Sequence, residues 1–138
     1  MRPEPRPLQF GRLFQLLERV LRLLGCRPAG KRLCTEDLHR PIRAVTLSAD
    51  ARADVARVQQ IWMECRERYG KLGLFLFGSF GGADAMFAPV VHRFRSYAIP
   101  VEPEVKVYME TMMALPAFGE WTRAGLAETL IVEKFEEA

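Results

Sequence analysis

The sequence predicts an all-α protein, a bundle of about five helices. The 138 residues are 49% hydrophobic and 27% charged, enough apolar sequence for one domain to bury a core without disulfides. Apolar residues recur at spacings of three and four along most of the chain, and Gly or Pro interrupts the pattern where one helix would end. Residues 74–77 could form a buried strand, but no partner strand is evident, so we interpret residues 71–81 as a packed loop.

Charge is unevenly distributed along the chain. Residues 1–34 carry a net charge of +6, whereas residues 35–138 carry −3. We therefore divide the chain into a basic leader (1–34), a helical domain (35–127) and an acidic tail (128–138). The basic residues from Lys31 to Arg43 have no aromatic side chain among them on which bases could stack, which argues against a nucleic-acid partner. No apolar run is long enough to span a bilayer, which argues against a membrane partner.

The first predicted helix is amphipathic and covers about residues 8–25. Its Arg side chains fall largely off the apolar face, and Gly25 is a suitable end. A contact with membrane or nucleic acid and an organelle presequence are alternatives, but we prefer a helix of the domain itself. The apolar face consists of Leu13, Leu16, Leu17, Val20, Leu21 and Leu24.

The cysteines and histidines indicate a reduced protein without a metal site. The number of cysteines is odd, and the spacing of Cys26, Cys34 and Cys65 matches neither a zinc site nor a redox pair. His39 and His92 are far apart in sequence and have no ligand spacing. A cytoplasmic location is the simplest interpretation.

A second helix is predicted over residues 49–69. Ser48 is a suitable N-cap and Gly70 a suitable stop. Its apolar residues step by three and four, which gives a narrow seam for packing against another helix. The seam consists of Val55, Val58, Trp62, Cys65 and Tyr69.

Three further helices follow. Residues 82–97 are apolar over most of the helix surface, as expected of a central helix, and contain Pro89. Pro103 suits the first position of the next helix, and Pro116 either stops that helix or starts the last one. The expected buried residues are Ala83, Phe87, Val90, Val91 and Phe94 in the first of these helices, Val105, Tyr108, Met109 and Met112 in the second, and Phe118, Trp121 and Leu126 in the third.

Two stretches resemble a known family. They are the run FLFG at 75–78 followed by ADAMFAPV at 83–90, and the run ALPAFGEW at 114–121 that follows Tyr108 and Met109. Together they resemble the all-α C-terminal domain of glutathione transferases, most closely the bacterial members. The resemblance extends back through residues 49–69 to about Leu38 and leaves out residues 1–34.

The resemblance implies an N-capping box at the start of the central helix. In the family, a Ser or Thr caps this helix, and an Asp three residues later bonds back to the backbone N–H of the cap. Asp84 occupies the Asp position, but the cap position is Gly81, so only the carboxylate half of the reciprocal pair remains. We therefore interpret Asp84 as a residue that stabilises the fold.

The resemblance also locates the family's chemistry outside this sequence. The family activates the glutathione thiol in an N-terminal thioredoxin-like domain, and residues 1–45 show no strand and helix alternation of that kind. We expect no catalytic residue, no metal and no bound glutathione in this chain alone. The helical domain contributes to the wall that binds a hydrophobic electrophile, which makes Phe87, His92, Arg93 and Tyr97 candidate substrate-binding residues. Packing in the core or at the surface is the alternative for each.

Two hypotheses for function follow. The first is a glutathione transferase represented by its helical substrate-binding domain, a truncated form that cannot conjugate glutathione alone. The second is a stand-alone helical module that binds another protein. The resemblance implies a homodimer or a missing thioredoxin-like domain as partner. It also implies exposed apolar surface on the first helix and the central helix, where that domain would dock. Whether the chain is an enzyme stays open at this point.

Overall fold

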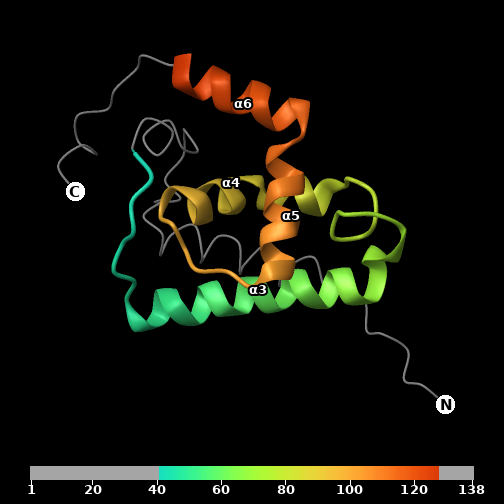
Figure 1. Cartoon of the computed structure of the whole chain (residues 1–138), viewed down its shortest axis with the longest axis horizontal. Helices are drawn as coiled ribbons and strands as arrows, with labels where there is room; N and C mark the ends of the chain where they lie inside the picture. The colour runs from blue at the N-terminus through green and yellow to red at the C-terminus, as the bar shows by residue number, and fades with distance from the viewer. Residues whose placement is uncertain (1–40, 128–138) are drawn as a thin grey trace.

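The computed structural model of the chain describes residues 41–127 (Figure 1). Within this range it contains four α-helices, one short 3-10 helix and no strand longer than an isolated bridge, so the all-α prediction is confirmed. The leader, the predicted helix over 8–25, Cys26, Cys34 and the acidic tail lie outside the described residues. The elements are α3 (Ala49–Tyr69), η1 (Gly70–Leu72), α4 (Gly82–Ser96), α5 (Pro103–Met113) and α6 (Pro116–Ala127).

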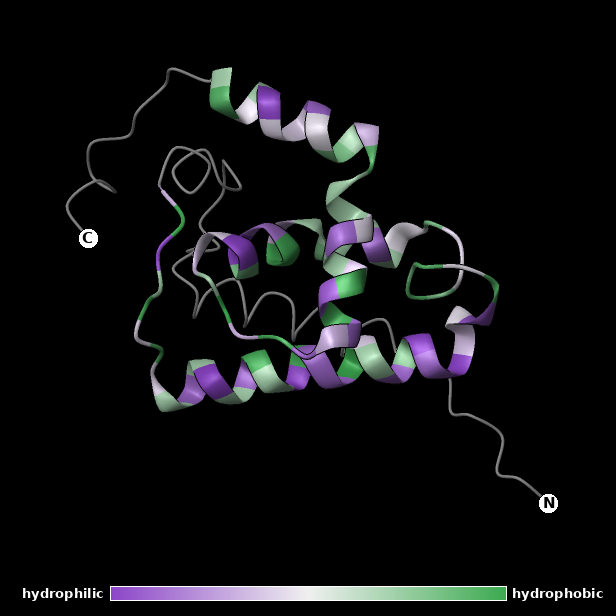
Figure 2. Cartoon of the chain, viewed as in Figure 1, coloured by the Kyte–Doolittle hydropathy of each residue, from purple (hydrophilic) through white to green (hydrophobic). Residues whose placement is uncertain are grey.

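The helices are arranged around α5. In Figure 1, α3 and α4 run in opposite directions and are joined at one end by the loop that follows η1. Helix α5 contacts α3, α4 and α6, and α6 lies beyond it on the side away from α3. In Figure 2 hydrophilic and hydrophobic residues alternate along α3, as expected of a helix with one buried face. No helix among the described residues is long and apolar enough to cross a membrane.

Helix α3 begins and ends where the sequence predicts. The Ser48 hydroxyl accepts a hydrogen bond from the backbone N–H of Ala51 at 3.2 Å, which satisfies one of the donors that a helix start leaves free. Gly70 ends the helix, and its own N–H donates to the carbonyl of Arg66. Its seam is buried at Val55, Val58, Trp62 and Cys65.

The core is centred on Trp62, which is fully buried. Its ring contacts Phe87 and Phe94 of α4 at centroid distances of 5.4 Å each, and Tyr108 of α5 at 5.0 Å. The contacts with Phe87 and Tyr108 are edge-to-face, the geometry that the quadrupoles of aromatic rings favour. One indole side chain thus joins three helices.

Helix α4 is the central helix, as predicted. Buried residues surround most of its circumference, and four charged or polar ones are among them: Asp84, His92, Arg93 and Ser96. Pro89 lies inside the helix, which continues from Gly82 to Ser96 across it. A core helix of this kind cannot present a broad apolar face to solvent.

The end of α4 is a Schellman turn with an alanine in the left-handed position. The N–H of Ile99 donates to the carbonyl of Phe94 at 2.9 Å, and the N–H of Ala98 donates to that of Arg95 at 3.0 Å. Ala98 has φ of 48°, a conformation that glycine adopts without the steric penalty of a Cβ. The sequence offers no glycine here to signal the turn.

We expect Ala98→Gly to stabilise the protein by about 0.5–1 kcal/mol, because the relief of Cβ strain exceeds the entropy that glycine loses on folding. Thermal unfolding followed by circular dichroism measures the effect. Ala56→Gly, at an exposed interior position of α3, is the matched control and should destabilise by about 1 kcal/mol. A lower melting temperature for Ala98→Gly would contradict the left-handed assignment.

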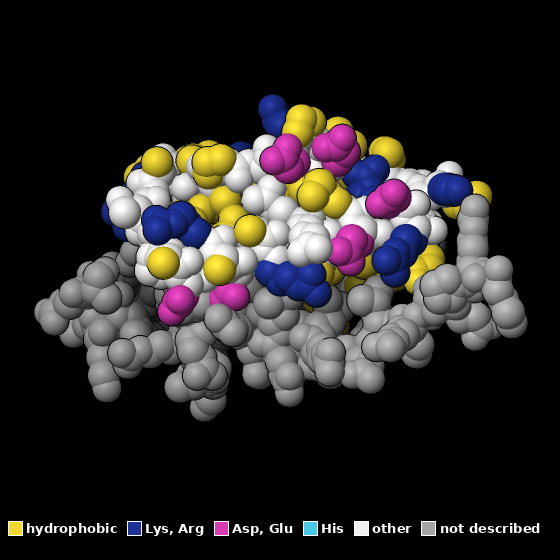
Figure 3. Space-filling model, turned by 90° about the horizontal axis from the view of Figure 1, so that it is seen from below, with side chains coloured by type: hydrophobic (Ala, Val, Ile, Leu, Met, Phe, Trp, Pro, Cys, Tyr) yellow, Lys and Arg dark blue, Asp and Glu magenta, His cyan; other side chains and the backbone are white. Residues whose placement is uncertain are grey.

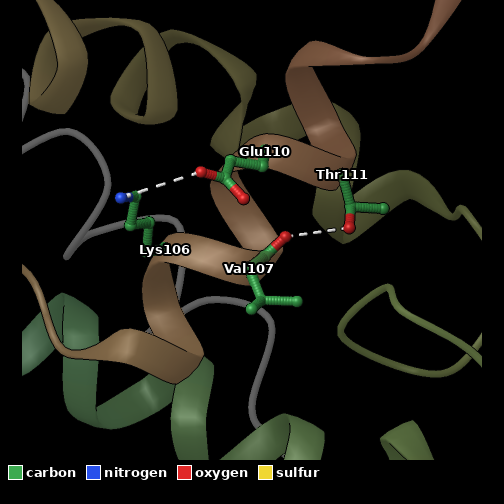
Figure 4. Close-up of polar contacts among 4 residues, drawn as sticks. All are labelled: Lys106, Val107, Glu110 and Thr111. Carbon is green, nitrogen blue, oxygen red and sulfur yellow. Dashed lines mark hydrogen bonds and ion pairs between the residues drawn. The ribbon is translucent and has the colours of Figure 1, made fainter.

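Polar side chains attach the start of α5 to α3. The Gln59 amide donates to the carbonyl of Pro100 at 3.3 Å and accepts from the N–H of Glu102 at 3.0 Å. Pro103 is at the first helical position, as predicted. On the exposed side of α5, Lys106 and Glu110 form an ion pair at 4.0 Å, and the Thr111 hydroxyl donates to the carbonyl of Val107 (Figure 4).

Helix α6 is attached mainly through its first half. Phe118 is buried and Trp121 is half-buried, and their rings lie 5.5 Å apart. Leu126 is 44% exposed, so the expectation that it is buried was wrong. The reason is that α6 extends away from α5 beyond its first turns (Figure 1).

Candidate functional site

The start of α4 is organised by the carboxylate of Asp84, which is fully buried. One oxygen, Oδ2, accepts a hydrogen bond from the N–H of Gly81 at 2.9 Å. The other, Oδ1, accepts from the N–H of Leu76 at 3.2 Å and from the hydroxyl of Tyr108 at 3.0 Å. Glycine has no side chain to return the bond, so the carboxylate alone makes the side-chain cap. It joins the α3–α4 loop, α4 and α5.

The loop that donates to Asp84 is tightly folded. Phe75 and Gly78 exchange two backbone hydrogen bonds of 3.2 and 3.3 Å, and Leu76 between them is buried. Gly78 has φ of 93°, and a Cβ on Gly73 would lie 2.0 Å from the carbonyl oxygen of Gly78. The close approach therefore requires glycine at 73, and the conformation favours it at 78.

Tyr108 is positioned as a hydrogen-bond donor. Burial raises the pKa of its phenol well above the usual value, and the adjacent Asp84 carboxylate raises it further. The phenol thus stays protonated in neutral solution and keeps its bond to Asp84. This assigns Tyr108 to the support of the fold rather than to proton transfer.

All four candidate substrate-binding residues belong to α4 or its C-cap, and Phe87 and His92 face in different directions. Phe87 is directed into the core, where its ring contacts Trp62. His92 faces the other way, toward α6: its ring lies 6.0 Å from that of Trp121, and its Nε2 is 3.3 Å from the hydroxyl of Ser96. Arg93 is buried in the last turn of α4, and Tyr97 is the half-buried C-cap.

The buried thiol of Cys65 lacks the environment of a nucleophile. Burial raises its pKa to about 11, and the nearby Glu64 contributes in the same direction. A reactive cysteine has a lowered pKa, in an electropositive and partly open site. Among residues 41–127 there is also no group of three side chains able to hold a metal ion.

Large apolar side chains are exposed on the loop between α3 and α4. We call them the 69–80 patch. Within it the rings of Tyr69 and Phe77 lie 5.3 Å apart. In Figure 3, which views the molecule from the α3 side, hydrophobic and basic side chains lie next to each other at the right-hand end. The patch consists of Tyr69, Leu72, Leu74, Phe77 and Phe80.

The patch corrects one prediction and differs in place from another. Tyr69 was expected on the buried seam of α3, but it is 37% exposed, because its ring packs on the loop instead of on α5. Exposed apolar surface was expected on the first helix and the central helix, where a further domain would dock. The central helix is buried on most sides, and the first helix lies outside the described residues, whereas the exposed apolar surface is on this loop.

Fold and site together define a class of protein: an all-α domain whose central helix is capped from within by a buried aspartate. A sequence model described as "Glutathione S-transferase, C-terminal domain" matches residues 48–124. The chain therefore belongs to the glutathione S-transferase family, through its C-terminal helical domain. No curated protein and no solved structure matches the sequence in the corresponding searches.

The sequence reasoning found Gly81 and Asp84 but missed two of the three groups that donate to the carboxylate. The backbone of Leu76 is eight residues away and Tyr108 is twenty-four residues away. A Tyr on an otherwise apolar face, such as Tyr108 beside Val105 and Met112, was the available signal, because a buried phenol needs a hydrogen-bond partner.

Proposed function

We propose that the chain supplies the helical substrate-binding half of a glutathione transferase and does not conjugate glutathione alone. The match over residues 48–124 supports the first part of this proposal. The second part is supported by residues 1–45, which lack the alternation of strands and helices expected of the domain in which the family activates the glutathione thiol. Cys65 offers no alternative nucleophile, because it is 5% exposed and its thiol has a pKa of about 11. A thiol of this kind is protonated at neutral pH and inaccessible to an electrophile. We also propose a cytoplasmic location, because the odd number and the spacing of the cysteines fit a reduced protein.

His92 is the best placed of the four residues proposed to bind substrate. It is on the side of α4 that faces α6, next to the half-buried Trp121, and an aromatic pair of this kind suits a hydrophobic electrophile. Phe87 supports such a wall from within the core, through its contact with Trp62. Arg93 and Tyr97 continue the same helix toward its C-terminal end.

The proposal predicts that the purified chain neither binds immobilised glutathione nor conjugates it to 1-chloro-2,4-dinitrobenzene. The rate of absorbance increase should equal that of the reaction without protein. A full-length family member assayed in parallel provides the positive control. Turnover above the uncatalysed rate would contradict the proposal, and its loss in Cys65→Ser would assign that turnover to Cys65.

The 69–80 patch favours a second candidate function, a helical module that binds another polypeptide. Leu72 is 96% exposed. The patch places five large apolar side chains at the connection between α3 and α4, and a contiguous exposed apolar surface of this kind marks an interaction site. The two functions are compatible, because a helical half also needs a partner.

A further inference from the structure

The 69–80 patch combines exposed apolar side chains with two adjacent basic residues, Arg68 and Lys71. Leu72, Leu74, Phe80 and Phe77 are 96%, 55%, 49% and 42% exposed. Arg68 and Lys71 are the basic side chains beside it, with Glu64 one helical turn before Arg68 and Glu67 next to it in sequence. Arg66 is directed to α5, where it donates to the carbonyl of Glu104 at 3.2 Å. A ligand that fits this surface would present apolar side chains together with carboxylates.

One segment of the chain has that composition. Residues 128–138, which lie outside the described residues, contain four Glu and one Lys, and therefore carry a net charge of −3. Four large apolar side chains are interspersed with these charges. They are Leu130, Ile131, Val132 and Phe135. The segment and the patch are thus complementary in both charge and hydropathy.

The positions of the two features indicate a contact between copies. The segment follows Ala127, at the end of α6, whereas the patch lies at the opposite end of the described domain (Figure 1). A second copy can present its segment to the patch without crossing the domain. Two such contacts, related by a twofold axis, would close a dimer.

We propose that the acidic segment 128–138 of one copy docks on the 69–80 patch of a second copy. The inference rests on the second candidate function, the polypeptide-binding module. Apolar contacts with Leu72 and Leu74 supply affinity, and Arg68 and Lys71 pair with the glutamates at the rim. Because the rim is exposed, the charged contacts weaken as salt increases.

The test uses the full chain and a fluorescein-labelled peptide of residues 128–138, with binding followed by anisotropy. Leu72→Ser/Leu74→Ser should weaken binding about tenfold or more, because two exposed apolar anchors are lost. Both side chains are exposed, so folding should be unaffected. Ile42→Ser is the matched control: Ile42 is 60% exposed but precedes α3, at the other end of that helix, and its replacement should leave affinity unchanged.

A charge exchange tests the rim separately. Arg68→Glu/Lys71→Glu should weaken binding of the natural peptide several-fold at low salt. A peptide carrying Glu133→Lys and Glu136→Lys should bind that variant more tightly than it binds the unmodified chain. Light scattering after size exclusion should give a dimer that becomes monomeric with excess peptide.

Three results would overturn the proposal. The first is that the peptide does not bind, and the second is that Leu72→Ser/Leu74→Ser binds it as tightly as the unmodified chain. The third is that the unmodified chain sediments with phosphatidylserine vesicles, that Leu72→Ser/Leu74→Ser does not, and that neither binds the peptide. The last result would assign the patch to anionic membranes. None of these outcomes depends on the glutathione assay. The docking of segment 128–138 and the proposed role in a glutathione transferase can therefore fail independently.

Discussion

Asp84→Ala should lower the free energy of unfolding by about 3–5 kcal/mol, because the carboxylate accepts three hydrogen bonds in the fully buried start of α4. Its removal leaves the N–H of Leu76 and the hydroxyl of Tyr108 without an acceptor, and each unsatisfied buried donor is costly. The side-chain cap of α4 is lost as well. Urea denaturation followed by circular dichroism measures the change.

Tyr108→Phe is the matched control for Asp84→Ala. It removes one donor and leaves the other two bonds of the carboxylate in place, so we expect a loss of about 1 kcal/mol. An Asp84→Ala variant with an unchanged urea midpoint would show that the carboxylate does not stabilise the fold. If the two variants lost the same free energy of unfolding, the hydrogen bond from Tyr108 to Asp84 would account for the whole contribution of the carboxylate.

The periodicity of the sequence predicts which face of each helix is buried. It correctly predicts burial of Val55, Val58 and Trp62 in α3, and of Val90 and Phe94 in α4. Spacing at three and four fixes the direction of a side chain from the helix axis, and neighbouring helices then cover that direction. This part of the fold could therefore be obtained from local sequence.

Periodicity does not predict where a neighbouring helix ends. Tyr69 and Leu126 continue the apolar pattern of α3 and α6, yet both are exposed, since each lies at the end of its helix. Periodicity also does not predict contacts between residues that are distant in sequence. The Leu76 N–H and the Tyr108 hydroxyl reach Asp84 only after the loop and α5 have packed on α4. Likewise, the left-handed Ala98 depends on the Schellman turn and has no glycine to mark it.

Trp62→Ala should destabilise the protein by about 3–5 kcal/mol, a loss comparable with that of Asp84→Ala. The substitution removes ring contacts with α4 and α5 at once and leaves a large cavity between the helices. The same denaturation measurement applies. A loss below about 1 kcal/mol would contradict a core centred on this residue.

Trp62→Phe separates volume from hydrogen bonding at the same position. The indole Nε1 finds no acceptor among the described residues, so phenylalanine gives up ring area without leaving a donor or acceptor unpaired. We therefore expect a smaller loss, about 1–2 kcal/mol.

The Trp62 ring contacts Tyr108, and Tyr108 donates to Asp84, so the aromatic core and the cap of α4 share one residue. The double variant Trp62→Phe/Tyr108→Phe should accordingly depart from additivity by about 0.5 kcal/mol or more, because the two side chains are in contact.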